Sequence, residues 1–161
     1  MSAGGDIPVT PLLKKTPLNP WLLFAALVVF LAASCTPEQR AVLEQINIDR
    51  AAMGQELLIP DQELIDHAQA WADTMAADGD LRHSPLNGDG LPSGWSVIGE
   101  NVGTGADLAS IQDAFLGSPA HRANMLDARF DTMGSGVAVG SDGQLWVVQL
   151  FAQYEPGAAA A

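Results

Sequence analysis

Apolar residues recur at helical spacing soon after residue 35. A helix start is predicted there, because Thr36 suits a cap, Pro37 suits the first helical position and Gln39 completes a capping box. The apolar stripe that follows consists of Val42, Leu43, Ile46 and Met53. Gly54 ends the segment, so we expect one helix between Thr36 and Gly54.

Three further segments show the same spacing. Asp61 is expected to cap a second helix, which Gly79 ends. The buried stripe of this helix consists of Leu64, Ala68, Trp71, Ala72 and Met75. Asp107 is expected to cap a third helix. The inward residues of that helix are Leu108, Ile111, Ala114 and Phe115. Ser118 as cap and Pro119 at the first position predict a short fourth helix.

The last third of the chain has the pattern of strands. Residues 133–139 alternate small and apolar side chains, and residues 145–152 are almost continuously apolar. Asp142 and Gly143 between them form a hairpin signal. A strand that is apolar on both sides is covered on both faces. The sequence therefore predicts a small sheet between helical layers.

Residues 81–105 are rich in Gly, Pro, Asn, Asp and Ser, and we interpret them as one long irregular segment. Such a segment inside a compact domain is typical of a functional or mobile loop. It carries His83 and Glu100. Together with Ser118–Leu126 it holds two of the three histidines of the chain. This combination marks the candidate functional region.

Some polar and aromatic residues allow two interpretations. Asn47 and Arg50 sit one turn apart on the first predicted helix, where they either bond a neighbouring loop or are solvated. The tryptophans Trp71, Trp95 and Trp146 are predicted to belong to the core rather than to stack on a ligand.

The acidic composition limits the classes of partner. The chain has 19 acidic residues against 7 Lys and Arg, which gives a formal net charge of −12. A nucleic-acid-binding protein needs a basic surface, so we predict no nucleic-acid partner. The chain of 161 residues is 48% hydrophobic, which is enough for one domain with a core and a terminal extension. We expect this domain to be monomeric.

The N-terminal segment is predicted to direct export of the chain. Basic residues precede an uncharged apolar run, Trp21–Ala33, and small residues follow it, which is typical of a secretory signal. Leu31–Cys35 resembles a bacterial lipobox, whose cysteine receives lipid. Ala32 and Ser34 suit an ordinary signal peptidase equally well, so lipid attachment at Cys35 and simple cleavage both stay open. Either outcome predicts an extracytoplasmic protein, secreted or anchored to the outer face of the cytoplasmic membrane.

Several motifs, in order along residues 38–153, carry a resemblance to a known family. They are Asn47-x-x-Arg50, Leu81-x-His83, Gly99-Glu100-Asn101, Ser118-Pro119-x-His121-Arg122-x-Asn124-x-Leu126 and the closing apolar strand. The chain resembles the bacterial, SCP-like branch of the CAP superfamily, which includes cysteine-rich secretory, antigen 5 and pathogenesis-related proteins. The resemblance implies an α+β fold, a three-layer α-β-α sandwich with a small antiparallel sheet and a surface cleft.

Three parts of the chain follow from these patterns. Residues 1–35 form a signal peptide or N-terminal lipoprotein anchor, residues 36–154 form the CAP (SCP-like) domain, and residues 155–161 form a disordered tail. The single cysteine, Cys35, excludes the internal disulfides of secreted eukaryotic members of the family.

The resemblance also implies the residues of the cleft. His83, Glu100 and His121 match two histidines and one acid of the family, while Ser118 stands where eukaryotic members have a second acid. Phe115 stands where those members have a tryptophan, a change common in bacterial relatives. Support of the cleft is predicted from Asn101, Ser118, Arg122 and Asn124, with Arg122 offering a planar fork to a carboxylate.

Three interpretations of this cluster stay open. The set can pin loops by hydrogen bonds, since buried polar groups need partners. Two neutral imidazoles and a carboxylate can also bind Zn²⁺ or another divalent cation reversibly. A metal-bound water can attack a carbonyl, which gives a hydrolase. The chain lacks a His-Glu-x-x-His motif, and no catalytic residue is assigned.

We therefore predict a binding or interaction module rather than an enzyme. A lipid or a cell-envelope component is a candidate ligand, and the N-terminal segment provides contact with the membrane. A metal-assisted, peptidase-like hydrolase that uses His83, Glu100 and His121 is the alternative. A defence or signalling factor that acts through its surface is a third class. The candidate cofactor is Zn²⁺ or another divalent cation.

Overall fold

The computed structural model describes residues 35–87, 91 and 93–154. The predicted export segment therefore lies outside the described residues, apart from Cys35, and so does the predicted tail, 155–161. Within the described part of the chain, no helix combines the length and the apolar character needed to cross a membrane.

Helices and strands are interleaved along the described chain. Their order is α2 (Pro37–Ala52), β1 (Ile59–Pro60), α3 (Gln62–Asp78), β2 (Trp95–Gly105), α4 (Leu108–Gly117), α5 (Pro119–Leu126), β3 (Thr132–Val139) and β4 (Leu145–Tyr154). The strands form one open, four-stranded sheet in the order β1-β3-β4-β2. β4 pairs antiparallel with both β2 and β3, and the two-residue β1 joins β3 in parallel.

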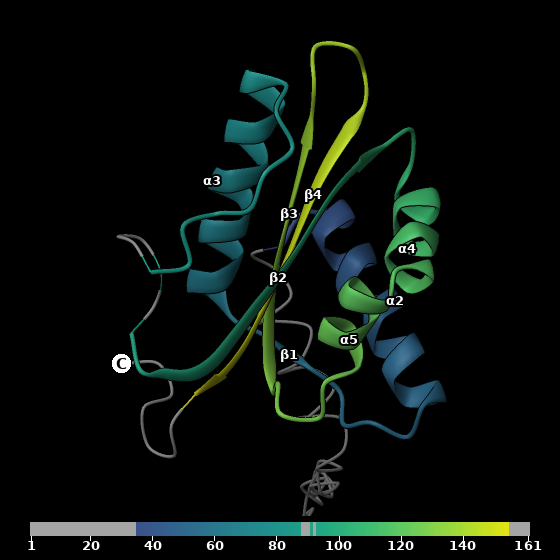
Figure 1. The fold of residues 1–161 in the computed structure, drawn as a ribbon, viewed down its shortest axis with the longest axis vertical. Helices are drawn as coiled ribbons and strands as arrows, with labels where there is room; N and C mark the ends of the chain where they lie inside the picture. Colours follow the sequence, from purple (N-terminus) through teal and green to yellow (C-terminus); the bar gives the residue numbers. More distant parts are fainter. Residues whose placement is uncertain (1–34, 88–90, 92, 155–161) are drawn as a thin grey trace, which may run out of the picture. The chain divides into compact units, whose positions relative to one another are not determined.

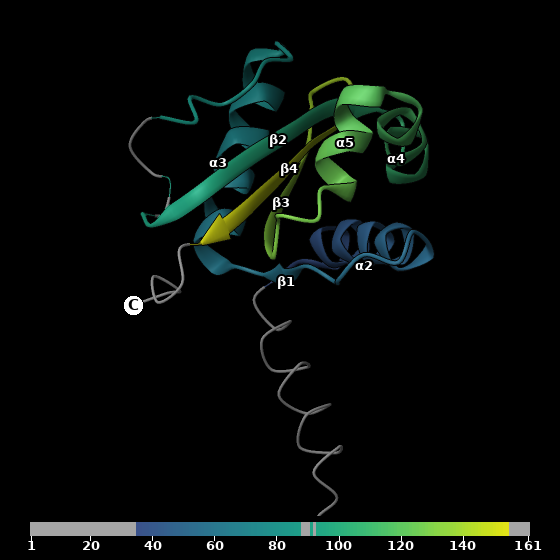
Figure 2. The same cartoon turned by 60° about the horizontal axis from the view of Figure 1, so that its bottom comes forward.

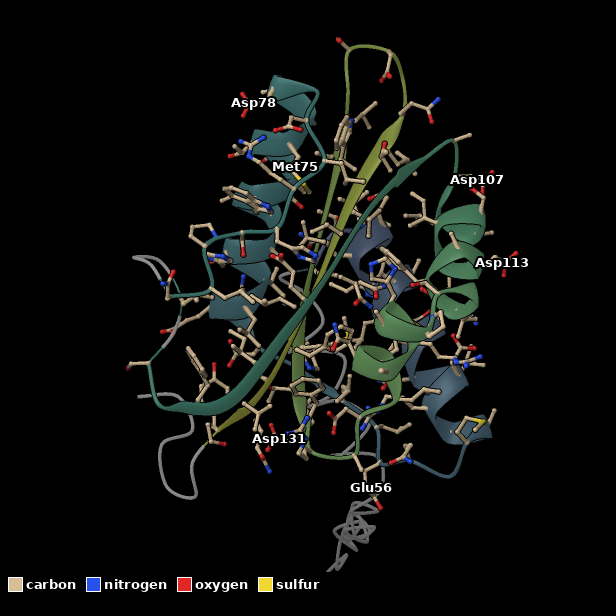
Figure 3. All side chains as sticks on the ribbon, viewed as in Figure 1. Glu56, Met75, Asp78, Asp107, Asp113 and Asp131 are labelled. Carbon is tan, nitrogen blue, oxygen red and sulfur yellow. The ribbon has the colours of Figure 1, made fainter. Side chains whose placement is uncertain are left out.

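The sheet lies between two helical layers. Helix α3 covers one face, and α2, α4 and α5 cover the other (Figure 1, Figure 2). Met75 extends from α3 towards the sheet, while Asp107 and Asp113 lie on the outer side of α4 (Figure 3). The α+β fold and the three-layer α-β-α sandwich are confirmed. The sheet is small, as predicted, but it is mixed rather than antiparallel, because β1 joins β3 in parallel.

Strand β4 forms the middle of both cores. Val147 and Phe151 belong to the cluster under α2, α4 and α5, whereas Val148 and Leu150 belong to the cluster under α3. Successive strand residues point to opposite faces, so the continuous apolar run fills both cores. The prediction of a strand covered on both sides is confirmed. Trp146 lies in the core, as predicted, and Trp71 and Trp95 are half-buried against the same cluster.

Helix starts follow the local chemistry of the sequence. The capping box of α2 is present, with Gln39 N donating to Thr36 Oγ1 at 3.2 Å and Thr36 N donating to Gln39 Oε1 at 2.8 Å. Asp61 accepts from Leu64 N at 3.0 Å and caps α3.

Ser118 holds the predicted N-cap position of α5, directly before Pro119, but its side chain does not cap the helix. It is the single residue between α4 and α5, and its side chain makes no capping hydrogen bond. Its backbone N–H instead continues α4 by donating to Ala114 O and Phe115 O. Because Ser118 ends one helix and begins the next, its N–H bonds α4 while its carbonyl accepts from Arg122 N of α5.

The interpretation of residues 81–105 as one irregular segment is wrong in its second half, where β2 pairs with β4. The glycines that suggest a loop are positions of close approach. A Cβ at Gly99 would lie 2.9 Å from the Phe130 ring, and one at Gly103 would lie 2.8 Å from the Phe115 ring. Small residues are needed here because helices and loops pack directly on this strand.

Candidate functional site

Glu100 is a buried carboxylate in the middle of β2. Its side chain is 0% exposed, although β2 is an edge strand. Oε1 accepts from the backbone N–H of Ser84 at 2.9 Å and lies 2.7 Å from Nδ1 of His83. Oε2 is buried and has no hydrogen-bond partner among the described residues. A buried carboxylate needs such partners, so Ser84 and His83 stabilise it.

His83 lies on the loop after α3 and turns outward. Its side chain is 60% exposed, while Nδ1 faces the buried Glu100. A carboxylate accepts hydrogen bonds, so Nδ1 carries the proton and the neutral ring keeps the lone pair on Nε2. The preceding residue is held by Trp71, whose Nε1 donates to Arg82 O at 2.9 Å and whose ring lies 5.1 Å from the Arg82 guanidinium carbon.

His121 comes from α5 and is half-buried. Its ring meets the Phe115 ring edge to face, with centroids 5.0 Å apart and an interplanar angle of 72°. Burial lowers the pKa of His121, and electrostatic repulsion by the nearby imidazole of His83, when both rings carry a proton on each nitrogen, lowers it further. The two imidazoles are therefore close enough for their charges to interact, and the neutral form of His121 is favoured.

Asn101 and Asn124 tie β2 to α5. Asn101 Nδ2 donates to His121 O at 3.1 Å, and Asn124 Nδ2 donates to Glu100 O at 3.1 Å. These bonds relate the strand that carries Glu100 to the helix that carries His121. Arg122 is exposed on α5, and no carboxylate of the described residues pairs with it.

Arg50 and Asn47 are bonded to neighbouring loops rather than solvated. The Arg50 side chain is fully buried and donates to four backbone carbonyls, those of Glu56, Met125, Asp127 and Phe130. Asn47 bonds both Leu58 N and Leu58 O, at 2.8 and 3.0 Å. Arg50 thus fixes the end of α5, the helix that presents His121.

The sequence interpretation missed Ser84 and Gln149. Ser84 supplies the N–H that holds Glu100, and nothing in a Ser-Pro dipeptide indicates this. Gln149 is 1% exposed and bonds Asn101. A signal for Gln149 was present, because it is the one strongly polar residue in the apolar run 145–152. A polar residue at such a place needs a partner.

The site fits a divalent cation only through its imidazoles. Among the described residues, no group of three His, Cys, Asp or Glu side chains is arranged to hold a metal ion. Glu100 Oε1 is already engaged by His83 and Ser84. A carboxylate bonded to Nδ1 of a histidine is a common partner of a metal-binding imidazole, whose Nε2 then faces the metal. The role of His83, Glu100 and His121 as ligands stays a prediction.

A groove lies away from these residues, between α2 and α4. It has a volume of about 320 Å³. Its lining consists of Ala41, Val42, Gln45, Leu108, Ala109, Gln112, Asp113 and Leu116.

Comparison with protein families identifies the family of this chain. The model of the CAP family, described as the cysteine-rich secretory protein family, matches residues 43–151, which is more than half of the chain. The chain belongs to the CAP family. No curated protein sequence matches it.

Solved structures of CAP proteins share the fold. An outer surface protein from Borrelia burgdorferi is similar with a TM-score of 0.64 and 18% identity, over 72% of this chain and 92% of that one. An extracellular SCP-domain protein from Bacillus anthracis is similar with a TM-score of 0.61 and 24% identity, over 75% of this chain and 45% of that one.

The protein NaASP2, whose crystal structure contains Zn²⁺, is also similar. Its TM-score is 0.58 at 17% identity, and the match covers 74% of this CAP chain and 81% of that one. At these identities the likeness shows the fold alone.

Proposed function

We propose that this CAP protein is an extracytoplasmic binding module that binds a divalent cation, Zn²⁺ or a similar ion, through the imidazoles of His83 and His121. The observation that carries the proposal is the 2.7 Å contact between His83 Nδ1 and the buried Glu100. This contact directs the free Nε2 of an exposed ring away from the carboxylate.

The state of His121 supports the same proposal. Metal ions bind the neutral imidazole, and burial favours that form of His121 by lowering its pKa. Zn²⁺ in the crystal structure of NaASP2 agrees with a cation-binding role for the fold. A bound cation would supply charge and a Lewis acid, while Glu100 would hold the proton on Nδ1 of His83.

The hydrolase alternative is less favoured by the geometry. Catalytic zinc usually has three protein ligands and one open position. Here Oε1 of Glu100 already accepts from His83 and Ser84, and Oε2 is buried, so we assign the coordination to the two imidazoles. Two ligands suit reversible binding, in which an envelope component or a lipid headgroup completes the coordination.

The extracytoplasmic location rests on the export segment and on the outer-surface and extracellular proteins that share the fold. Anchoring by lipid at Cys35 is part of the proposal. Helix α2 begins at Pro37, so a lipid on Cys35 would hold the domain directly at the membrane. Mass spectrometry of the mature N-terminus tests this, and an unmodified Cys35 would rule it out.

Isothermal calorimetry with Zn²⁺ on the full-length protein tests the binding site. We expect heat of binding in the wild type, and its loss in the double variant His83→Ala/His121→Ala. The control is His67→Ala, which removes the remaining histidine, on α3, and should keep binding. Zn²⁺ binding that survives the double substitution would overturn the proposal. Zn²⁺-dependent peptide hydrolysis that the double variant abolishes would establish the enzyme instead.

A further inference from the structure

A chain of hydrogen-bonded side chains crosses the molecule from the surface of α2 to the candidate site. We call it the amide chain, and its members are Asp49, Gln112, Gln149, Asn101 and Asn124. Gln112 Nε2 donates to Asp49 Oδ2 at 2.8 Å, and Gln149 Nε2 donates to Gln112 Oε1 at 3.1 Å. Asn101 Nδ2 donates to Gln149 Oε1 at 3.0 Å, and Asn124 Nδ2 donates to Asn101 Oδ1 at 3.0 Å.

The middle of this amide chain is buried. Asn101 is 0% exposed, Gln149 is 1% exposed and Gln112 is 7% exposed. Water cannot replace a lost partner freely at these positions, so each amide depends on its neighbours. A disturbance at one amide is therefore expected to reach the next one.

The groups at the two ends of the amide chain require the same orientation of the side-chain amides between them. A carboxylate only accepts, so Gln112 must turn its NH₂ group to Asp49 and its oxygen to Gln149. The backbone carbonyl of His121 also only accepts, so Asn101 must turn its NH₂ group to His121. The two requirements agree, because the same orientation lets Gln149 donate to Gln112 and accept from Asn101.

We propose that Asp49 is a positioning residue for the candidate site. None of the sequence motifs includes Asp49 as a site residue. It sets the direction of the amide chain and so holds Asn101 on the His121 carbonyl and Asn124 on the Glu100 carbonyl. Asp49 also accepts a longer bond from Gln45 at 3.4 Å on its other oxygen. The link to binding rests on the proposed function, but the amide chain itself can be tested without it.

If the amide chain has a fixed direction, a second carboxylate at position 149 should conflict with the carboxylate of Asp49. In Gln149→Glu, the new carboxylate still accepts from Asn101 but cannot donate to Gln112. Gln112 can donate to this carboxylate only if its side-chain amide rotates by half a turn. Its own oxygen then faces the Asp49 carboxylate, and two acceptors repel each other. Adding Asp49→Asn removes this conflict, because the new amide donates to the turned Gln112.

Charge alone offers a competing explanation for such a rescue, and Asp113 provides the control. It lies next to Gln112 in sequence but points outward from α4 (Figure 3). Asp113→Asn also removes one negative charge, next to Gln112 on α4, but Asp113 makes no hydrogen bond within the amide chain. It should therefore fail to rescue Gln149→Glu.

The measurements are exchange protection of the side-chain amides of Asn101 and Asn124 by NMR, and Zn²⁺ affinity by calorimetry. We expect Gln149→Glu to lower protection and affinity about tenfold, Asp49→Asn to restore most of both, and Asp113→Asn to restore neither. Equal rescue by the two aspartate substitutions, or none by Asp49→Asn, would overturn the proposal. Wild-type protein that binds no Zn²⁺ would refute the proposed function, while the amide protection would still decide the role of Asp49.

A second variant covers the case in which Gln149→Glu does not fold. Asp49→Ala removes only the half-buried end of the amide chain, and we expect it to lower protection at Asn101 severalfold. Asn47→Ala, which removes an unrelated amide from the same helix, should leave Asn101 protected. Unchanged protection at Asn101 in Asp49→Ala would refute a positioning role.

Discussion

The Nδ1 atom of His83 lies 2.7 Å from Oε1 of Glu100, so an exposed ring is joined to a carboxylate with no exposed surface. The residues come from a loop and from the middle of an edge strand. The contact gives the loop after α3 a fixed point on the sheet. It also gives the buried charge one of its two hydrogen-bond partners.

Substitution of Glu100 should reveal this coupling. We expect Glu100→Ala to lower the free energy of unfolding by about 1–3 kcal/mol, because the buried N–H of Ser84 loses its acceptor. A double-mutant cycle with His83→Ala should give a coupling of about 0.5–1 kcal/mol, small because the ring is exposed. Urea denaturation measures both values. Additive effects of the two substitutions would contradict the coupling.

Arg50 should matter far more for stability than a surface arginine. In Arg50→Met, four backbone carbonyls lose their donor, and we expect a loss of about 3 kcal/mol or more. Arg129→Met is the control, because Arg129 is exposed and only pairs with the nearby Asp127. Its effect on the urea midpoint should be small. Similar midpoints for the two variants would be evidence against the role of Arg50.

Gly136 allows β3 to approach the backbone of α3. A Cβ at this position would collide with backbone atoms of Ala68, which no side-chain rotation can relieve. We expect Gly136→Ala to destabilise the protein by about 1–3 kcal/mol or to prevent folding. Gly117→Ala at the end of α4 meets nothing within 4 Å, and it should be neutral or slightly stabilising. Thermal unfolding of the two variants compares them directly.

Tyr154 should ionise at unusually high pH. Burial, together with the negative charges of Asp61 and Glu63, raises the pKa of Tyr154 to about 12 from its ordinary value of 10.0. It is the single tyrosine of the chain, so phenolate absorbance near 295 nm reports on it alone. The titration midpoint should fall back towards 10.0 when the protein is unfolded in urea.

The raised pKa of Tyr154 also makes the stability of the fold depend on pH. Because the folded state holds the Tyr154 proton more tightly, the contribution of this group is complete below about pH 10. It is lost as the pH rises through about 12. Asp61→Asn should move the phenol midpoint downward, because it removes the first of the neighbouring charges. An unchanged midpoint would mean that burial acts alone.

Local chemistry was enough to predict much of the fold. The capping box at Thr36 and the cap at Asp61 depend on residues three positions apart, so the sequence displays them directly. The hairpin at Gly143, where φ is +81°, and the doubly buried β4 follow from equally local patterns. The motifs also singled out His83 and Glu100, whose side chains are in contact, while their role as ligands stays a prediction.

Other features depended on contacts between residues far apart in the chain. β2 looked irregular because its glycines weaken a strand locally, and only the packing of Phe115 and Phe130 explains them. The amide chain from Asp49 to Asn124 links side chains from α2, α4, β4, β2 and α5. The sequence by itself determined where the helices α2 to α5 begin, where the hairpin between β3 and β4 turns and which strand is buried on both faces. The tertiary structure decided which polar groups meet, because hydrogen-bond partners inside a core are chosen by packing distance and not by sequence spacing.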